Sequence, residues 1–203
     1  MAASPSELRQ CLRHACEESF NCISIDGDTS TNDTVLILAS GESGISLKAP
    51  MALKKFRGAL FSICQSLARQ IVADGEGVQH VVRLHIEQAR SRDEALRVAN
   101  AISRSLLVKT AWAGADPNWG RILAAMGASG LPIDPNRVDI SIGKQKVCRG
   151  GVSNPFDERQ AHAELAKPES DIRIQLRRGS ASLTFLTTDL TAEYVRINAD
   201  YST

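Results

Sequence analysis

The chain has 203 residues, of which 43% are hydrophobic, enough to build one large globular domain or two small ones. Its 24 basic and 23 acidic side chains give a formal net charge of +1, which favours neither nucleic acid nor an anionic membrane as a partner. No apolar run approaches the roughly 20 residues of a membrane-spanning helix, so we expect a soluble protein.

The cysteines and the first residues bear on the cellular compartment. An odd number of cysteines without a C-x-x-C pair, and no apolar secretory segment before them, predict reduced thiols and a cytoplasmic protein. Acidic residues near the start, such as Glu7 and Glu17, also argue against an Arg-rich organellar presequence. The five cysteines are Cys11, Cys16, Cys22, Cys64 and Cys148.

The first half of the chain alternates helical and β-type patterns. A capping box, Ser4 to Glu7, predicts a helix at the start of the chain. Two β-type runs, 20–25 and 34–39, flank a polar loop, and a long helix follows from about Leu53 to Ile71. The alternating segment 82–87 predicts a strand with one buried face, which makes His85 a solvated strand residue.

The second half begins with another capping box, Ser91 to Glu94, which predicts a helix through Ile102. An apolar run, 106–112, follows, and Asp116-Pro117 supplies the N-cap and first turn of a helix through Met126. The remainder predicts a strand at 138–142, a helix at 157–166, a hairpin at 172–187 that turns at Gly179, and a short helix at 190–197.

The interleaved strands and helices lack the regular period of a parallel α/β fold and lack a glycine-rich phosphate loop. We therefore expect an α+β fold with mixed or antiparallel sheets packed with helices. The predicted boundary separates an N-terminal part, 1–110, from a C-terminal domain, 111–203.

The polar loop "DGDTSTNDT", Asp26 to Thr34, admits three interpretations. Asp26 and Asp28 after a hydrophobic strand resemble the Mg²⁺-dependent phosphoryl-transfer enzymes, although that chemistry needs a parallel sheet. A calcium loop fails because Thr31 and Ile37 stand where glycine and glutamate are required. The favoured interpretation is a connection whose polar side chains hydrogen-bond their own backbone. No metal site is expected.

Two further glycine-containing segments are candidates for function. "ADGEG" places Glu76 between two glycines just after a helix, where a tight turn exposes the carboxylate; from spacing alone, a C-cap turn with an incidental acid is the favoured interpretation. "DPNWGR" places Gly120 in the first turns of a helix, which fits either anion binding or tight helix packing.

Four segments together resemble a known family. They are "SFNCISIDGDTSTNDTVLILASG", "ADGEG", "LVKTAWAGADPNWGRILAAMG" and "EYVRINADYST". In order and spacing they resemble the C-terminal half, or β subunit, of the ornithine acetyltransferase (glutamate N-acetyltransferase, ArgJ) family over about residues 6–203. The resemblance implies the β-subunit half of the DmpA/ArgJ-like fold. It also implies a partner, the α subunit, in a heterotetrameric α2β2 assembly.

The family's activity, by the same resemblance, is acetyl transfer from N-acetylornithine to glutamate in arginine biosynthesis, with no cofactor. Its precursor cleaves itself before a threonine, which becomes the nucleophile. That threonine is expected just before "AASPSEL", where this chain has Met1, while Thr29, Thr31 and Thr34 lie inside the chain. We therefore expect no catalytic residue in residues 1–203 and no activity from them alone. The alternative is a non-catalytic binding or assembly subunit derived from the family.

The resemblance places substrate contacts on Glu76, Asn198 and Thr203. A carboxylate suits a cationic amine of ornithine, and an amide with a hydroxyl suits the polar ends of an amino acid. The expected ligands are N-acetylornithine, ornithine and glutamate.

Overall fold

The computed structural model describes residues 2–200, which form two compact units. The first comprises the chain up to Ile23 together with Thr29–Ile71, and the second comprises Ser24–Asp28 together with the chain from Val72 onward. The predicted boundary between 110 and 111 lies inside a helix of the second unit, and it stays a prediction.

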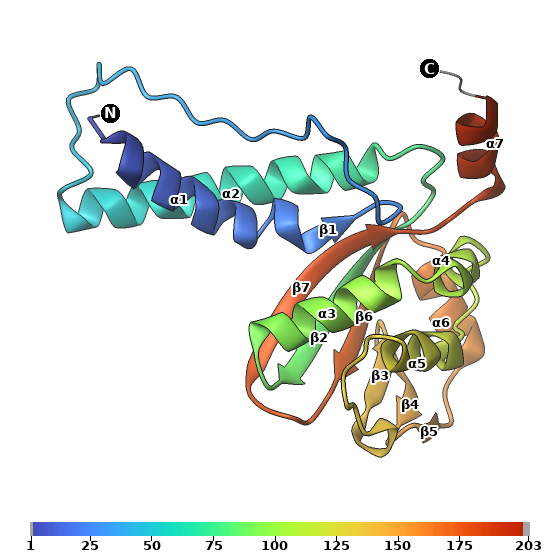
Figure 1. The fold of residues 1–203 in the computed structure, drawn as a ribbon. Helices are drawn as coiled ribbons and strands as arrows, with labels where there is room; N and C mark the ends of the chain where they lie inside the picture. The colour runs from blue at the N-terminus through green and yellow to red at the C-terminus, as the bar shows by residue number, and fades with distance from the viewer. Residues whose placement is uncertain (1, 201–203) are drawn as a thin grey trace. The chain divides into compact units, whose positions relative to one another are not determined.

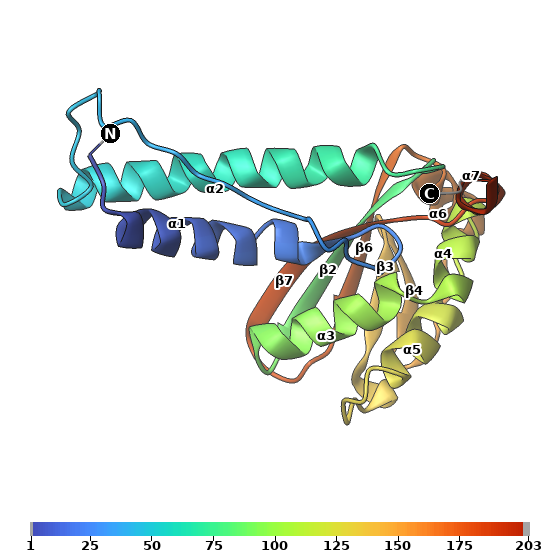
Figure 2. The same cartoon turned by 45° about the horizontal axis from the view of Figure 1, so that its top comes forward.

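Two helices make up most of the first unit. Helix α1, Pro5–Glu17, begins with the predicted capping box, because Ser4 Oγ accepts from the Glu7 N–H and the Glu7 carboxylate accepts from the Ser4 N–H. Helix α2, Pro50–Ala73, runs alongside α1 in both views (Figures 1 and 2). Their buried side chains include the small residues Cys11, Ala15, Cys64 and Ala68.

The two β-type runs around the polar loop were predicted wrongly as strands. Residues 20–22 form a 3₁₀ turn, η1, and only Ile23–Ser24 form strand β1. Residues 34–39 belong to no helix or strand, and Leu36 and Leu38 are 79% and 93% exposed. β-type side chains do not make a strand unless a neighbouring strand accepts the backbone hydrogen bonds, and residues 2–200 provide none for this segment.

A seven-stranded mixed sheet in the order β1-β7-β2-β6-β3-β4-β5 organises the second unit. This confirms the α+β class. After β1, the strands are β2 (Val81–Ala89), β3 (Asp139–Ile142), β4 (Gln145–Arg149), β5 (Val152–Ser153), β6 (Glu169–Gln175) and β7 (Ala181–Thr188).

The predicted hairpin of β6 and β7 is wrong, because β2 lies between them. β6 pairs parallel with β2 and β7 pairs antiparallel with it, so the β6–β7 connection passes over the end of β2. There the N–H groups of Arg178 and Gly179 both donate to the Gln88 carbonyl. Burial decides this order, since Leu84 and Ile86 are fully buried and need apolar neighbours on both sides.

Five helices accompany the sheet: α3 (Arg92–Ser103), α4 (Leu106–Ala113), α5 (Trp119–Gly127), α6 (Glu158–Leu165) and α7 (Ala192–Asp200). Helix α3 packs on β2 and β7, and α6 packs on β6 and β3 (Figure 1). A short 3₁₀ turn, η2, spans Pro135–Arg137. The core comprises the fully buried aliphatic residues of β2, β3 and β6 with the buried face of α3.

Helix caps follow the sequence closely at two sites and differ at a third. Ser91 caps α3 as predicted, and Asp157, predicted as the first residue of the helix at 157–166, is the N-cap of α6. Helix α5 starts two residues later than predicted: Asn118, not Asp116, is the N-cap, and its Oδ1 accepts from the Arg121 N–H. No helix within residues 2–200 is long and apolar enough to cross a membrane.

Candidate functional site

The turn that carries Glu76 is hydrogen-bonded to the start of α7. Gly77 has a φ of +64°, and a Cβ there would lie 2.5 Å from the Tyr194 backbone nitrogen, so only glycine fits. Thr191 Oγ1 donates to the Gly77 carbonyl at 2.7 Å and accepts from the Tyr194 N–H at 3.2 Å. The turn after α2 and the N-terminus of α7 therefore form one hydrogen-bonded junction.

Two of the three residues implicated by the sequence meet at this junction. Asn198 Nδ2 donates to Glu76 Oε2 at 2.8 Å and also to the Tyr194 carbonyl at 3.0 Å. Both Glu76 and Asn198 are exposed, so the pair is accessible to a ligand. Thr203, the third residue, lies outside the described residues.

Tyr194 and Asp26 extend this site, and sequence reasoning missed both roles. The Tyr194 hydroxyl donates to Asp26 Oδ2 at 3.0 Å. Burial raises the pKa of Tyr194 to about 12, helped by the hydrogen bond to Asp26 and by the charges of Asp26, Asp28 and Glu76. Three carboxylates thus act on one phenol, and their combined field favours a cation. The spacing of Tyr194 and Asn198, four residues apart on one helix, is the sequence signal that could have revealed Tyr194.

The polar loop bears out the favoured interpretation of its side chains. Asp26 Oδ1 accepts from the Asp28 N–H at 2.9 Å, and Thr34 Oγ1 donates to the Asn32 carbonyl at 3.0 Å. Within residues 2–200 no three His, Cys, Asp or Glu side chains are grouped to hold a metal ion. Both Asp26 oxygens accept hydrogen bonds from the protein itself.

No other group approaches Gly120 closely within the described part of the chain. A Cβ at this position would meet only Asn118 Oδ1, at 3.6 Å, which is an ordinary contact. Tight helix packing therefore does not explain this glycine within residues 2–200.

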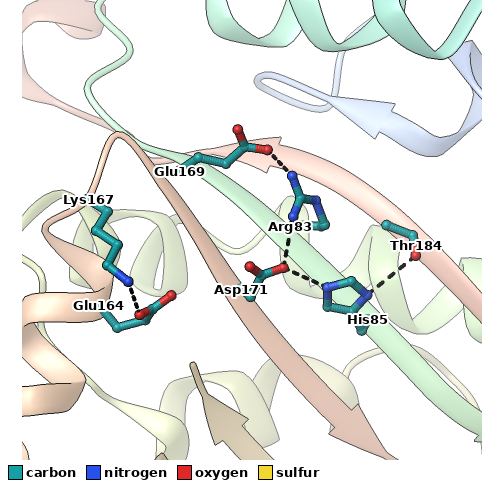
Figure 3. A network of polar contacts seen from close by, with 7 residues as sticks. All are labelled: Arg83, His85, Glu164, Lys167, Glu169, Asp171 and Thr184. Carbon is teal, nitrogen blue, oxygen red and sulfur yellow. Dashed lines mark hydrogen bonds and ion pairs between the residues drawn. The ribbon is translucent and has the colours of Figure 1, made fainter. Parts of the chain in front are cut away.

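A second polar cluster lies on β2, β6 and β7 (Figure 3). His85 Nε2 lies 2.7 Å from Asp171 Oδ1, and His85 Nδ1 lies 3.4 Å from Thr184 Oγ1. Arg83 pairs with Asp171 at 3.1 Å and with Glu169. Burial raises the pKa of Asp171, but His85 and Arg83 outweigh it, so the pKa is lowered overall.

The order of carboxylate, imidazole and hydroxyl in Figure 3 resembles a hydrolase triad, but the geometry of these three groups does not suit nucleophilic catalysis. The hydroxyl contact is long, and Asp171 shares its charge with Arg83. These side chains bridge neighbouring strands, as does the ion pair of Arg173 with Glu87. We assign the cluster to sheet stability. His85, predicted as solvated, is half-buried within it.

An open hollow of about 270 Å³ is formed by residues from α3 and from the segment after α5. Its lining residues are Arg97, Asn100, Ala101, Arg104, Ala128 and Ser129, and it shares none of them with the Glu76 site. The Arg97 guanidinium already donates to the Ser129 carbonyl at 3.2 Å.

The sequence and the fold both match a family of biosynthetic proteins. The ArgJ family profile matches residues 1–203, and the chain belongs to that family. It is 43% identical over 199 residues to the arginine biosynthesis bifunctional protein ArgJ of Desulfotalea psychrophila, covering 97% of this chain and 51% of the relative. It is 41% identical to the glutamate N-acetyltransferase of Methanopyrus kandleri, and the match covers 100% of this chain and 53% of that relative.

A crystal structure gives the same result for the fold. The arginine biosynthesis bifunctional protein of Bacillus halodurans superposes with a TM-score of 0.92 at 38% identity, covering 98% of this chain and 94% of that one. The chain spans about half the length of the curated relatives it matches. Residues 1–203 therefore correspond to one portion of those longer proteins.

Proposed function

We propose that this chain is the C-terminal, substrate-binding portion of an ornithine acetyltransferase, which moves acetyl from N-acetylornithine to glutamate. The single observation that carries the proposal is the hydrogen bond between Asn198 and Glu76. It joins two of the residues that the family resemblance assigns to the substrate, and relatives named for arginine biosynthesis and glutamate N-acetyltransferase support the reaction class.

The proposed reaction has two acyl-transfer steps and needs no cofactor. The nucleophilic threonine of the complete enzyme attacks the acetyl carbon through its hydroxyl; the C–N bond to ornithine breaks and the departing amine takes the proton. The amine of glutamate then attacks the acyl ester, the C–O bond breaks, and the proton returns to the threonine. Oxyanion donors from the other portion stabilise both tetrahedral intermediates.

Glu76 and Asn198 bind the amino-acid part of the substrate. The Glu76 carboxylate accepts charge-assisted hydrogen bonds from a cationic amine of ornithine. Asn198 fixes the orientation of that carboxylate through its amide donor. The family resemblance adds the Thr203 hydroxyl as a third proposed contact. The charges of Asp26 and Asp28 add to the field that attracts the cation.

The partner is the N-terminal portion, or α subunit, in an α2β2 assembly. Ile63, Leu67 and Ile71, spaced by four residues on α2, are 57%, 45% and 47% exposed. Leu36 and Leu38 are exposed on the extended segment 34–39, whose backbone lacks a neighbouring strand within residues 2–200. Apolar side chains and unpaired backbone of this kind favour association with another chain segment. The five free thiols support the cytoplasm as the compartment.

Transfer of radiolabelled acetyl from N-acetylornithine to glutamate tests the proposal. The assay compares this chain, preceded by the family's threonine and paired with the N-terminal portion, against each portion alone. The proposal predicts transfer by the pair. The alternative, a binding or assembly subunit, predicts a stable complex of the two portions without transfer, and that result would reject the catalytic proposal.

A further inference from the structure

A buried lysine is connected to the Glu76 site through a series of contacts. Lys109, on α4, is 1% exposed, and its Nζ donates to the Thr188 carbonyl at 2.5 Å and to Thr188 Oγ1 at 3.0 Å. Burial lowers the pKa of Lys109 to about 8, while the charges of Asp189 and Asp26 act in the opposite direction. Lys109 is therefore mostly charged at neutral pH, and its contacts with Thr188 offset part of the cost of burial.

The ammonium fixes the direction of the Thr188 hydroxyl. An ammonium group donates only, so Thr188 Oγ1 accepts from Lys109 and its own hydrogen is left to donate elsewhere. That hydrogen goes to the Ile25 carbonyl, 3.2 Å from Thr188 Oγ1. Lys109 thus holds β7 against the backbone that leads into Asp26.

The contacts continue from Ile25 to the proposed substrate residues. Asp26, the next residue, accepts from the Tyr194 hydroxyl at 3.0 Å. Tyr194 lies one turn before Asn198 on α7, and its carbonyl accepts from Asn198 Nδ2, which also donates to Glu76. All of these residues belong to the second compact unit.

From this chain of contacts we infer that Lys109 is a positioning residue for the Glu76–Asn198 pair, an inference that rests on the proposed function. It acts through Thr188, Asp26 and Tyr194, and it does not touch the substrate. The polar loop that begins at Asp26 thereby gains a role: its first carboxylate connects the buried lysine to α7.

The test uses the complete two-portion enzyme. Lys109→Met removes the ammonium and keeps the length of the side chain. The matched control is Lys146→Met, which removes another ammonium. Lys146 lies on β4, separated from β7 by three strands, and its Nζ is 3.1 Å from the buried Asp139. The first readout is the ¹³Cζ resonance of Tyr194 at neutral pH, assigned with Tyr194→Phe. The second readout is the pair of separately measured values of kcat and KM for N-acetylornithine.

We expect Lys109→Met to move the Tyr194 resonance to the position of a water-exposed tyrosine and Lys146→Met to leave it unchanged. Misplaced substrate contacts lower kcat/KM by about ten- to a hundred-fold, through a raised KM. A merely stabilising lysine would lower the melting temperature and change neither readout.

Thr188 provides an independent pair of variants in case Lys109→Met does not fold. Thr188→Val keeps the shape and deletes the hydroxyl, so it reproduces the effect on Tyr194, whereas Thr188→Ser keeps the hydroxyl and preserves the wild-type resonance. An unchanged Tyr194 resonance in Lys109→Met, or in Thr188→Val, would overturn the inference. If the wild-type pair transfers no acetyl, the proposed function fails, and the Tyr194 resonance still decides the positioning role.

Discussion

Asn198 donates a 2.8 Å hydrogen bond to Glu76 across 122 positions of sequence. The contact depends on the backbone at Gly77, because the N-terminus of α7 lies where any Cβ would stand. A turn at one end of α2 and the last described helix therefore share one small polar site.

Residues 1–203 alone are expected to transfer no acetyl and to undergo no self-cleavage. Acyl transfer needs an activated nucleophile and oxyanion donors, and our proposal places both outside residues 1–203. The radiolabelled transfer assay and intact mass of the purified polypeptide check this prediction. Robust turnover by the polypeptide alone would contradict it.

Removal of the residues after Ile197 should impair turnover while leaving the fold intact. The deletion takes away Asn198 and Thr203, but α7 contains no buried residue within its described length, so little packing is lost. We expect a melting temperature close to that of the wild type together with a reduced kcat/KM. A large loss of thermal stability would show that the end of the chain serves the fold instead.

Asp139 should make the fold sensitive to acid. Burial raises its pKa, but the Gly150 N–H at 2.9 Å and the cations of Lys146 and Arg177 outweigh burial, and the pKa is lowered. A carboxylate with a lowered folded-state pKa stabilises the fold above its unfolded value of about 3.9, and this contribution is lost as the pH falls through the folded value.

Asp139→Asn should therefore cost about 1.5 to 3 kcal/mol of unfolding free energy at pH 7, because it weakens the charge-assisted hydrogen bonds that the buried carboxylate accepts from Gly150, Lys146 and Arg177. The loss relative to wild type should shrink as the pH falls below about 3.9, where the carboxyl of the unfolded chain becomes protonated, and should be gone below the lower folded-state pKa. Denaturant titrations at several pH values measure both. A difference independent of pH would mean that the charge of Asp139 contributes nothing.

The cysteines should all carry free thiols. Four of them are buried, and Cys16 is half-buried with a pKa raised first by its burial and then by Cys64 and Glu17. Alkylation of the unfolded chain without reductant should therefore add five groups by intact mass. Fewer adducts, restored to five by a reductant, would reveal a disulfide.

Sequence reasoning succeeded where the determinants are local. The capping box at Ser4 and the periodicity of α2 specify their helices within a few residues of chain. It failed for the β6–β7 pair, since the insertion of β2 depends on burial between distant segments. It also failed for 34–39, because β-type side chains form no strand without a partner.

The site was predictable only in part, for the same reason. The family resemblance identified Glu76 and Asn198, and the glycine-flanked turn gave a physical reason for exposing Glu76. The contact of Tyr194 with Asp26 spans 168 positions, and no local pattern encodes it. Lys109 sits inside an apolar run, where a lysine suggests a surface position and not the core.

The most direct test of our account is the kcat/KM of Glu76→Gln in the two-portion enzyme with N-acetylornithine and glutamate. Glutamine keeps the shape of the side chain and removes the charge, so the loss of a charge-assisted hydrogen bond should cost about 1.5 to 3 kcal/mol, roughly ten- to a hundred-fold in kcat/KM. The matched control, Glu158→Gln, alters an exposed carboxylate in the first turn of α6 and should retain wild-type turnover. Full kcat/KM for both substrates in Glu76→Gln would contradict the assignment of this chain as the substrate-binding portion.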